Sequence, residues 1–260
     1  MEDLFRKVAF EAAIRAGEIV ASALEKPREV HHKGPRDLVT DADFAAEKAI
    51  MDTITSWFPD HSICSEEEPF QRGNSPYTWY IDPLDGTTNY FHRLPIFCVS
   101  VALAEKGEVI LGVVYEPLSK RLFWAQKGRG AYLNDRPIRV STISSTEESL
   151  VGLDLPRLQS LRSEFGALIP RIMEKVFTIR AMGSAVLGLC FVAAGWLEAY
   201  LHFSLKPWDL AAGALIVEEA GGRVTRVDGK PWHLEARALL ASNGLLHDEF
   251  LKILSNFSGS

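Results

Sequence analysis

The segment from Asp82 to Asn89, which reads DPLDGTTN, carries two carboxylates three positions apart. It follows an apolar run that predicts a strand over residues 77–81, and Pro83 stiffens the turn between the two acids. On such a turn Asp82 and Asp85 can converge on one point, and hard divalent cations such as Mg²⁺ require oxygen ligands of this kind. Because Asp-Pro and Asp-Gly are also common turn dipeptides, an ordinary acidic turn is the alternative interpretation.

The same segment also favours phosphate binding. Gly86 allows close approach to the backbone, and the NH groups of Gly86, Thr87 and Thr88 suit a turn that cradles a phosphate. A metal ion and a phosphate would then be neighbours. It is this combination, rather than either half of it, that favours a catalytic site over a simple turn.

Two further acids lie near the ends of predicted elements. Glu66, in SEEEP, follows a predicted strand at Ile63, and it reaches the same edge as Asp82 if the two strands are neighbours. A solvated acidic loop is the alternative. Asp209, in PWDLAAG, stands at the start of a predicted helix, where an Asp is often only an N-terminal cap. Each signal is weak alone.

Two helices are expected before the first strands. Apolar residues at helical spacing predict a helix over residues 2–25 that Pro27 ends. Thr40 and Asp43 form a capping-box pattern that opens a second helix, which runs to Phe58. Asp43 is therefore a candidate cap. The polar residues 31–36 between these helices predict a loop.

Short apolar runs and alternation then predict strands from residue 61 onward, including an antiparallel meander over residues 97–133. After a Ser/Thr-rich stretch at residues 141–149, strands and helices alternate, as in an α/β layer. Strands are expected at 150–153, 177–179, 198–201, after 222 and at 239–242, and helices at about 158–175, from 183, at about 208–220 and from 246.

Composition excludes several classes. The chain has 260 residues, 47% hydrophobic and 24% charged, which is typical of a globular protein with a sizeable core. Its 28 basic residues against 34 acidic ones give a net charge of −6, which argues against sequence-independent binding to nucleic acid. We therefore expect no nucleic-acid partner.

The pattern also argues against a membrane or secreted protein. The longest apolar stretch, Ala185 to Leu197, is shorter than the roughly 18 residues that a spanning helix needs, and it suits a buried helix or an interface. The first residues have no basic and apolar signal pattern, so we expect a cytoplasmic protein without a membrane partner. Cys64, Cys98 and Cys190 are odd in number and widely separated, which favours reduced core thiols.

Five segments together resemble the inositol monophosphatase family of Mg²⁺-dependent, lithium-sensitive sugar phosphatases, in order and approximate spacing. They are Asp41-Ala42-Asp43, Glu66-Glu67, Asp82 to Asn89, Gly183-Ser184-Ala185, and Pro207 to Gly213. The resemblance spans nearly the whole chain and implies an α+β fold, a layered αβαβα sandwich of the sugar phosphatase type. It implies an N-terminal α+β part over residues 1–145 and a C-terminal α/β part over residues 146–260, with the site between them. Family members are commonly homodimers.

By that resemblance the site holds two or three Mg²⁺ ions and a small phosphorylated polyol or sugar. One metal would bind Glu66, Asp82 and the carbonyl of Leu84, a second would bind Asp82, Asp85 and Asp209, and a third, weaker ion would lie near Glu66. Thr87, backed by Asp43, would orient the attacking water. The remaining substrate contacts implied are Asp85, Gly86, Thr87, Gly183, Ser184, Ala185, His202 and Asp209.

His202 departs from the family pattern. Inositol-selective members usually place a Glu seven residues before the metal-binding Asp, where this chain has His202. A neutral imidazole can still bond a hydroxyl, a protonated one favours a second anionic group, and a solvent-facing strand residue is the alternative. Lys33 and Arg36 match a mobile loop near the family's active site, or are solvated basic residues.

The resemblance leaves the substrate open. Myo-inositol monophosphate is the family default, and fructose 1,6-bisphosphate is the second choice. Histidinol phosphate lacks an acidic partner for its ammonium group. A non-catalytic regulatory binding protein is the alternative from another class, because a fold does not dictate a function. Loss of a metal ligand or of Thr87 would indicate it, and this sequence retains all of them.

Overall fold

The larger of the two main sheets has seven strands in the order β3-β4-β5-β6-β7-β8-β9. The computed structural model describes residues 2–26, 30–34, 37–156 and 159–255. All neighbouring strands are antiparallel except β3 and β4. The strands are β3 (Ser62–Ser65), β4 (Tyr77–Asp85), β5 (Cys98–Glu105), β6 (Glu108–Glu116), β7 (Arg121–Gln126), β8 (Ala131–Leu133) and β9 (Arg136–Ile138).

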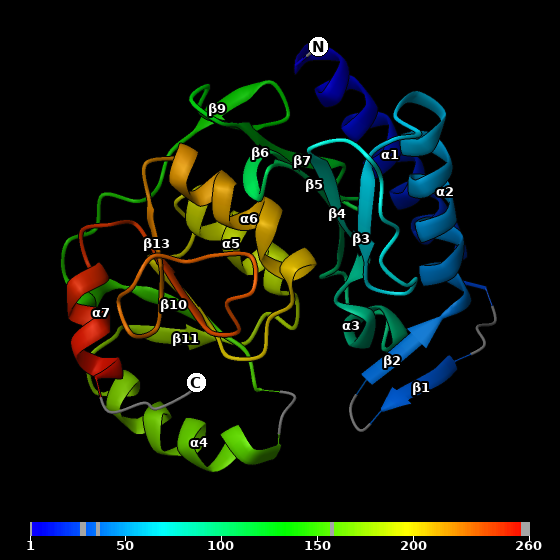
Figure 1. Ribbon diagram of the computed structural model, residues 1–260. Helices are drawn as coiled ribbons and strands as arrows, with labels where there is room; N and C mark the ends of the chain where they lie inside the picture. Colours follow the sequence, from blue (N-terminus) through cyan, green and yellow to red (C-terminus); the bar gives the residue numbers. More distant parts are fainter. Residues whose placement is uncertain (1, 27–29, 35–36, 157–158, 256–260) are drawn as a thin grey trace.

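Two helices cover the outer face of this sheet, α1 (Glu2–Ala23) and α2 (Asp41–Trp57) (Figure 1). Small buried residues of α1, such as Ala9, Ala12 and Ala16, bring the two helices close together. The helices and the sheet bury Trp79 and other large side chains in one hydrophobic core. The burial of this apolar face is what holds the helices on the sheet.

The second sheet has five strands in the order β11-β10-β12-β14-β13. β10 is parallel to β11 and β12, whereas β14 is antiparallel to β12 and β13. The strands are β10 (Leu150–Leu153), β11 (Thr178–Arg180), β12 (Ala199–His202), β13 (Arg223–Arg226) and β14 (Leu239–Ser242), and a 3₁₀ turn η1 (Thr146–Glu148) precedes β10.

Helices α5 (Ala185–Ala193) and α6 (Pro207–Glu219) lie between the two sheets, and α4 (Gln159–Met173) and α7 (His247–Leu254) cover the outer face of the second one (Figure 1). Eight residues of α5 are buried, so its apolar stretch belongs to the core. The layers therefore run α, β, α, β, α, which confirms the expected α+β sandwich. The division near residue 145 stays a prediction.

Two expectations about local structure were wrong. Residues 31–36 do not form only a loop, because β1 (Val30–Gly34) pairs antiparallel with β2 (Asp37–Thr40). β4 continues past residue 81 to Asp85, because pairing with β5 carries the strand through the sequence that resembled a turn. Pro27 and Arg36 lie outside the described residues. The short helix α3 (Thr87–Phe91) begins directly after β4.

The remaining expectations about segments agree with the structure to within a few residues. None of the helices in the described ranges combines the length and the apolar character that crossing a membrane demands. Cys98 and Cys190 are buried and Cys64 is half-buried, and all three are free thiols.

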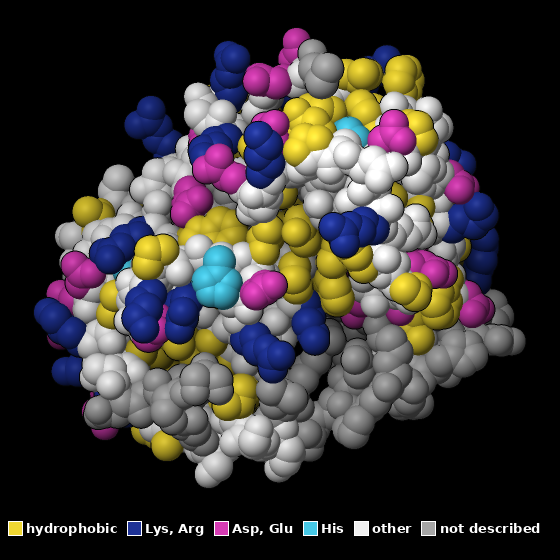
Figure 2. Space-filling view, in the orientation of Figure 1, with side chains coloured by type: hydrophobic (Ala, Val, Ile, Leu, Met, Phe, Trp, Pro, Cys, Tyr) yellow, Lys and Arg dark blue, Asp and Glu magenta, His cyan; other side chains and the backbone are white. Residues whose placement is uncertain are grey.

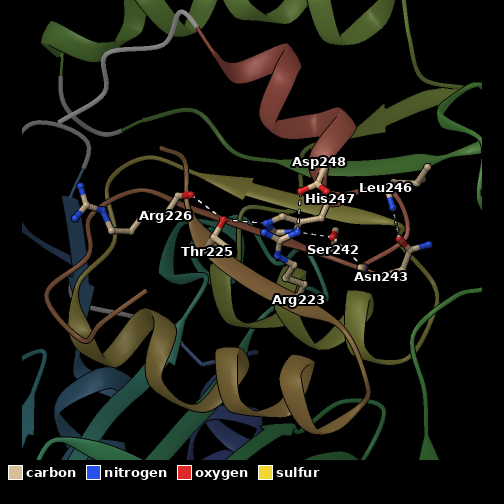
Figure 3. A network of polar contacts seen from close by, with 9 residues as sticks. Arg223, Thr225, Arg226, Ser242, Asn243, Leu246, His247 and Asp248 are labelled. Carbon is tan, nitrogen blue, oxygen red and sulfur yellow. Dashed lines mark hydrogen bonds and ion pairs between the residues drawn. The ribbon is translucent and has the colours of Figure 1, made fainter. Parts of the chain in front are cut away.

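His247, the first residue of α7, is completely buried in a polar network. Its Nε2 lies 2.9 Å from Thr225 Oγ1, and its Nδ1 lies 2.8 Å from Ser242 Oγ (Figure 3). Since Thr225 donates its hydroxyl hydrogen to the carbonyl of Arg226, its oxygen accepts a hydrogen bond from Nε2. The network therefore makes Nε2 a donor, and the buried ring ties β13, β14 and α7 together.

The environment of His247 disfavours its charged form. Burial, and after it the charge of Arg223, lowers the pKa of His247 from 6.5 to about 4, while Asp248 acts in the opposite direction. Because the folded pKa lies below the unfolded value, the unfolded chain binds the proton more tightly. The contribution of the neutral ring to stability is complete above about pH 6.5 and is lost as the pH falls toward 4.

We predict that His247 makes folding sensitive to mild acid. Between pH 7 and pH 5 its contribution to the free energy of unfolding should fall by about 2 kcal/mol. Urea unfolding of the wild type and of His247→Gln at both pH values measures this. The variant should be less stable than the wild type at pH 7, and the difference between their free energies of unfolding should be about 2 kcal/mol smaller at pH 5. A difference that is the same at both pH values would show that the ring does not resist protonation.

Candidate active site

Asp82 and Asp85 lie within the last residues of β4 rather than on a turn after it. Asp82 is in register with Ser100 of β5 and Asp85 with Cys98, and the ladder is irregular between these two pairs. In a regular strand, residues three apart point to opposite faces of the sheet. The irregularity between Asp82 and Asp85 breaks that alternation. The charge of Asp85 is one of the causes that raise the pKa of Asp82.

Asp82 is the most buried of these acids, with 1% of its surface exposed. Within the described residues its side chain accepts one hydrogen bond, from the backbone NH of Leu84 to Oδ1 at 3.0 Å. Burial, and after it the negative charges of Glu66, Asp85 and Asp209, raises the pKa of Asp82 well above its usual range. Four carboxylates therefore share one electrostatic site.

Asp85 is held by the segment that leads into α5. Its carboxylate accepts hydrogen bonds from the Ser184 hydroxyl, from the NH of Val186 at 2.9 Å and from the NH of Ala185 at 3.3 Å. Burial raises the pKa of Asp85 to about 6, although these three donors oppose the shift. The two halves of the chain thus meet directly at a candidate metal ligand.

Glu66 is half-buried and lies in the loop after β3. β3 pairs with β4, so the two strands are neighbours, as the prediction for Glu66 required. The loop is fixed by Glu47 of α2, which accepts hydrogen bonds from the Ser65 hydroxyl and from the backbone NH groups of Glu67 and Glu68. Burial raises the pKa of Glu47. Sequence reasoning missed Glu47, because one acid among the polar residues of a helix carries no local signal.

Asp209 is the third residue of α6, and its Oδ2 accepts the backbone NH of Lys206 at 2.7 Å. It is both the predicted cap and a neighbour of Asp82, on whose pKa it acts. Asp43 is likewise the third residue of its helix, α2, and caps the helix start. Its Oδ2 accepts hydrogen bonds from the backbone NH of Thr40 at 2.8 Å and from the Thr40 hydroxyl at 2.6 Å.

Thr87, the first residue of α3, lies between two acceptors. Its hydroxyl oxygen is 3.0 Å from the carbonyl oxygen of Leu84 and 3.4 Å from Asp43 Oδ1. A hydroxyl has one hydrogen and can donate fully to only one of them. Because Thr40 occupies the other oxygen of Asp43, Oδ1 faces Thr87, and the structure brings the predicted Thr87 and Asp43 pair together.

Gly183 stands between Asn89 of α3 and the end of β10. Its φ is +68°, and a Cβ there would lie 2.7 Å from the side-chain nitrogen of Asn89. Asn89 is itself fixed, since its amide donates to the carbonyls of Ile96 at 2.8 Å and Met182 at 2.9 Å. The helix α5 begins at Ala185 with Ser184 as its cap, rather than at Gly183.

A cavity of about 410 Å³ opens beside these residues. It is lined by the start of α3, by the turn at residues 181–185, by Asp85 and Asp209, and by His202. His202 is half-buried, and its Nδ1 accepts the backbone NH of Ser204 at 3.2 Å, so it does not simply face solvent. In Figure 2 this face is hollowed near its lower centre, with Lys and Arg side chains beside the hollow.

Two charged lining residues had no place in the sequence analysis, Asp154 after β10 and Arg162 of α4. Asp154 lies directly before Leu-Pro and Arg162 lies on a helix, and neither pattern distinguishes a site residue from a surface one. Arg36 lies outside the described residues, as does the side chain of Lys33.

The donor set fits a divalent cation by its chemistry. Buried carboxylates that raise one another's pKa need compensating positive charge, and carboxylate and carbonyl oxygens are the ligands that Mg²⁺ prefers. In the part of the chain that the structure describes, no three acidic, His or Cys side chains are already gathered into a closed set of ligands.

Comparison with known proteins shows the family of this chain. The family model for the inositol monophosphatase family matches residues 1–258. A relative from Solanum lycopersicum, inositol monophosphatase 2, is 41% identical over 260 residues, which covers 96% of this chain and 98% of the relative. Fructose-1,6-bisphosphatase/inositol-1-monophosphatase of Thermotoga maritima is 40% identical over 222 residues, with 85% and 84% covered.

A solved structure has nearly the same fold. The crystal structure of the extragenic suppressor protein suhB from Bartonella henselae matches with a TM-score of 0.95 and 34% sequence identity, covering 98% of this chain and 99% of that one. The family to which these similarities point is generally metal-dependent. The layered sandwich is thus a shared feature.

We predict that Gly183→Ala disturbs the site more than strain alone would. Gly107→Ala is the matched control, because Gly107 has φ +85° but no atom within 4 Å of the point where a Cβ would stand. A left-handed alanine costs about 1 kcal/mol or slightly more. Denaturant unfolding should show that loss for Gly107→Ala and about 1 kcal/mol beyond it for Gly183→Ala, through contact with Asn89. Equal losses would contradict the close packing.

Proposed function

The chain belongs to the inositol monophosphatase family of phosphomonoester hydrolases, and we propose that it hydrolyses a small polyol or sugar phosphate with Mg²⁺. Myo-inositol monophosphate is the proposed substrate. The observation that carries the proposal is the shared electrostatic site of Glu66, Asp82, Asp85 and Asp209 beside a cavity that the start of α3 lines. Carboxylates on one side and backbone NH groups on the other suit a metal ion and a phosphate, respectively.

In this proposal Glu66, Asp82 and the Leu84 carbonyl hold one Mg²⁺, and Asp82, Asp85 and Asp209 hold a second. A third, weaker ion lies near Glu66. When bound, such ions lower the pKa of an attacking water and stabilise the leaving alkoxide. The irregular ladder at the end of β4 supports this assignment, because it breaks the strand alternation that would point Asp82 and Asp85 to opposite faces.

Thr87 and Asp43 orient the water in this proposal. If Thr87 donates its hydroxyl hydrogen bond to Asp43 Oδ1, at 3.4 Å, its oxygen is left to accept a hydrogen bond from the attacking water and so to orient it. The NH groups of Gly86 and Thr87 bind phosphate oxygens at the start of α3. Gly183, Ser184, Ala185 and His202 line the wall that would contact the polyol.

One observation favours a second candidate substrate, a sugar bisphosphate such as fructose 1,6-bisphosphate. Arg162 lines the cavity, and its Nε donates to the carbonyl of Pro156 at 3.1 Å. Over the described ranges the guanidinium forms no ion pair, so its outer NH groups can meet an anionic group of the substrate. His202 lines the same cavity, and because its Nδ1 accepts from Ser204, its Nε2 carries the hydrogen and can donate to that group.

We also propose a cytoplasmic homodimer, on the family resemblance and on the three free thiols. Sedimentation equilibrium would test the dimer. A purely regulatory binding role is less well supported, although the similar suhB protein is named for suppression rather than for a substrate. Such a role would tolerate loss of Thr87 or of a carboxylate, and this chain keeps them all.

The decisive prediction concerns Asp85→Asn. Phosphate release from inositol 1-phosphate should require Mg²⁺ and should fall more than about 100-fold in the variant, because a metal ligand is lost. Thermal unfolding and the unchanged activity of Asp52→Asn, an exposed acid of α2, serve as controls. Wild-type activity in folded Asp85→Asn would show that the metal assignment is wrong.

A separate prediction tests the choice of substrate. If Arg162 reads a second anionic group, Arg162→Ala should raise the KM for fructose 1,6-bisphosphate by roughly 10-fold, the effect of losing one charge-assisted contact. The KM for inositol 1-phosphate should change little. Steady-state kinetics on both substrates measures this, and equal changes would remove Arg162 from substrate selection.

A further inference from the structure

Asp154 is a buried acid beside the active site to which no role has been given above. It directly follows β10 and has 8% of its surface exposed. Its Oδ1 accepts the backbone NH of Gly183 at 2.6 Å, and its Oδ2 accepts the hydroxyl of Tyr200 at 2.6 Å. Both oxygens are therefore engaged by groups whose positions the fold determines.

Tyr200 is fixed just as firmly. It lies on β12 in register with Gly152 of β10, and it is completely buried. Its ring fills the space that side chains at two glycines would need, since a Cβ at Gly188 would come within 2.3 Å of the ring and a Cβ at Gly152 within 2.7 Å. The ring cannot turn away, so its hydroxyl stays directed at Asp154.

The turn at Gly183 is therefore held from two sides. Asp154 binds its NH from the second sheet, and Asn89 of α3 binds the preceding carbonyl, that of Met182, at 2.9 Å. Gly183 adopts φ +68° between these two contacts. The residues that follow it donate three hydrogen bonds to Asp85, from Ser184, Ala185 and Val186.

We propose that Asp154 and Tyr200 are positioning residues that set the orientation of Asp85 through the Gly183 turn. The path runs from the Tyr200 hydroxyl to Asp154, to the NH of Gly183, and through the next three residues to the Asp85 carboxylate. Neither residue is a ligand of the metal in the site described above. The kinetic part of this inference rests on the proposed function, but its structural part does not.

The geometry gives the pair a clear consequence. Partners that orient the ligands of a metal site typically change metal affinity or activity by 10- to 100-fold when they are lost. Asp154→Ala removes the acceptor from Gly183, and we expect it to lower kcat by about that factor. We expect a similar rise in the half-saturating Mg²⁺ concentration, with a smaller change in KM.

The variants form a graded series. Asp154→Asn keeps an oxygen that can accept from Gly183, and Tyr200→Phe removes only the outer hydrogen bond, so both should retain more activity than Asp154→Ala. Tyr90→Phe is the matched control, because Tyr90 is equally buried and loses its hydroxyl bond to the carbonyl of Val20, at 3.1 Å. It should lose stability without losing kcat.

Two measurements do not depend on turnover. Hydrogen exchange resolved to the peptide that contains Ala185 and Val186 should be at least about tenfold faster in Asp154→Ala than in Tyr90→Phe, because the amides of the turn lose their fixed position. Calorimetric titration with Mg²⁺ should likewise show weaker binding to Asp154→Ala than to Tyr90→Phe. Both tests remain valid even if the wild type releases phosphate from none of the substrates.

The outcomes separate the alternatives. Faster exchange, weaker Mg²⁺ binding and a loss of kcat that Asp154→Asn partly restores would support the positioning role. A raised KM with unchanged kcat and exchange would overturn it and make Asp154 a substrate contact. Equal losses in Tyr90→Phe and Tyr200→Phe would also overturn it, by showing a general effect on stability. If Asp154→Ala does not fold, Asp154→Asn and Tyr200→Phe decide the question alone.

Discussion

The concentration of negative charge around Asp82 is the constraint on which the rest of this structure depends. A carboxylate with 1% of its surface exposed, close to three others, opposes folding unless its surroundings compensate for it. The raised pKa values of Asp82 and Asp85 express that cost. The local structure around Asp82 must therefore hold these carboxylates together against their mutual repulsion.

Helix starts provide part of the compensation. Asp43 is the third residue of α2, Asp209 the third of α6, Thr87 the first of α3, and Ser184 caps α5. The positive end of each helix dipole therefore faces the region where negative charge gathers, and the first NH groups of α5 donate directly to Asp85. In the proposed function, the same residues that begin the helices supply the chemistry. Under that proposal capping and catalysis are not competing explanations of Asp43 and Asp209, because one position serves both.

The sequence predicted the parts of the site that depend on local order, and missed those that depend on distant contacts. The segment from Asp82 to Asn89 and Asp209 could be placed because their neighbours form recognisable strand ends and helix starts. The extension of β4 to Asp85 was missed because Pro83 and Gly86 resemble a turn, whereas pairing with β5 decides the outcome. Glu47 and Asp154 were missed because their partners lie at least 18 positions away along the chain.

Helices α5 and α6 explain why the candidate site forms only when both sheets are folded and packed together. Asp82 and Asp85 come from the seven-stranded sheet, while the donors to Asp85 come from the start of α5, whose buried face belongs to the core between the two sheets. A shift of α5 would therefore move the groups that orient Asp85 without touching β4. Because densely packed cores resist such shifts, the apolar layer of α5 and α6 acts on the chemistry by keeping two polar surfaces in register. The free energy gained by burying the hydrophobic core therefore offsets the cost of holding the buried carboxylates close together.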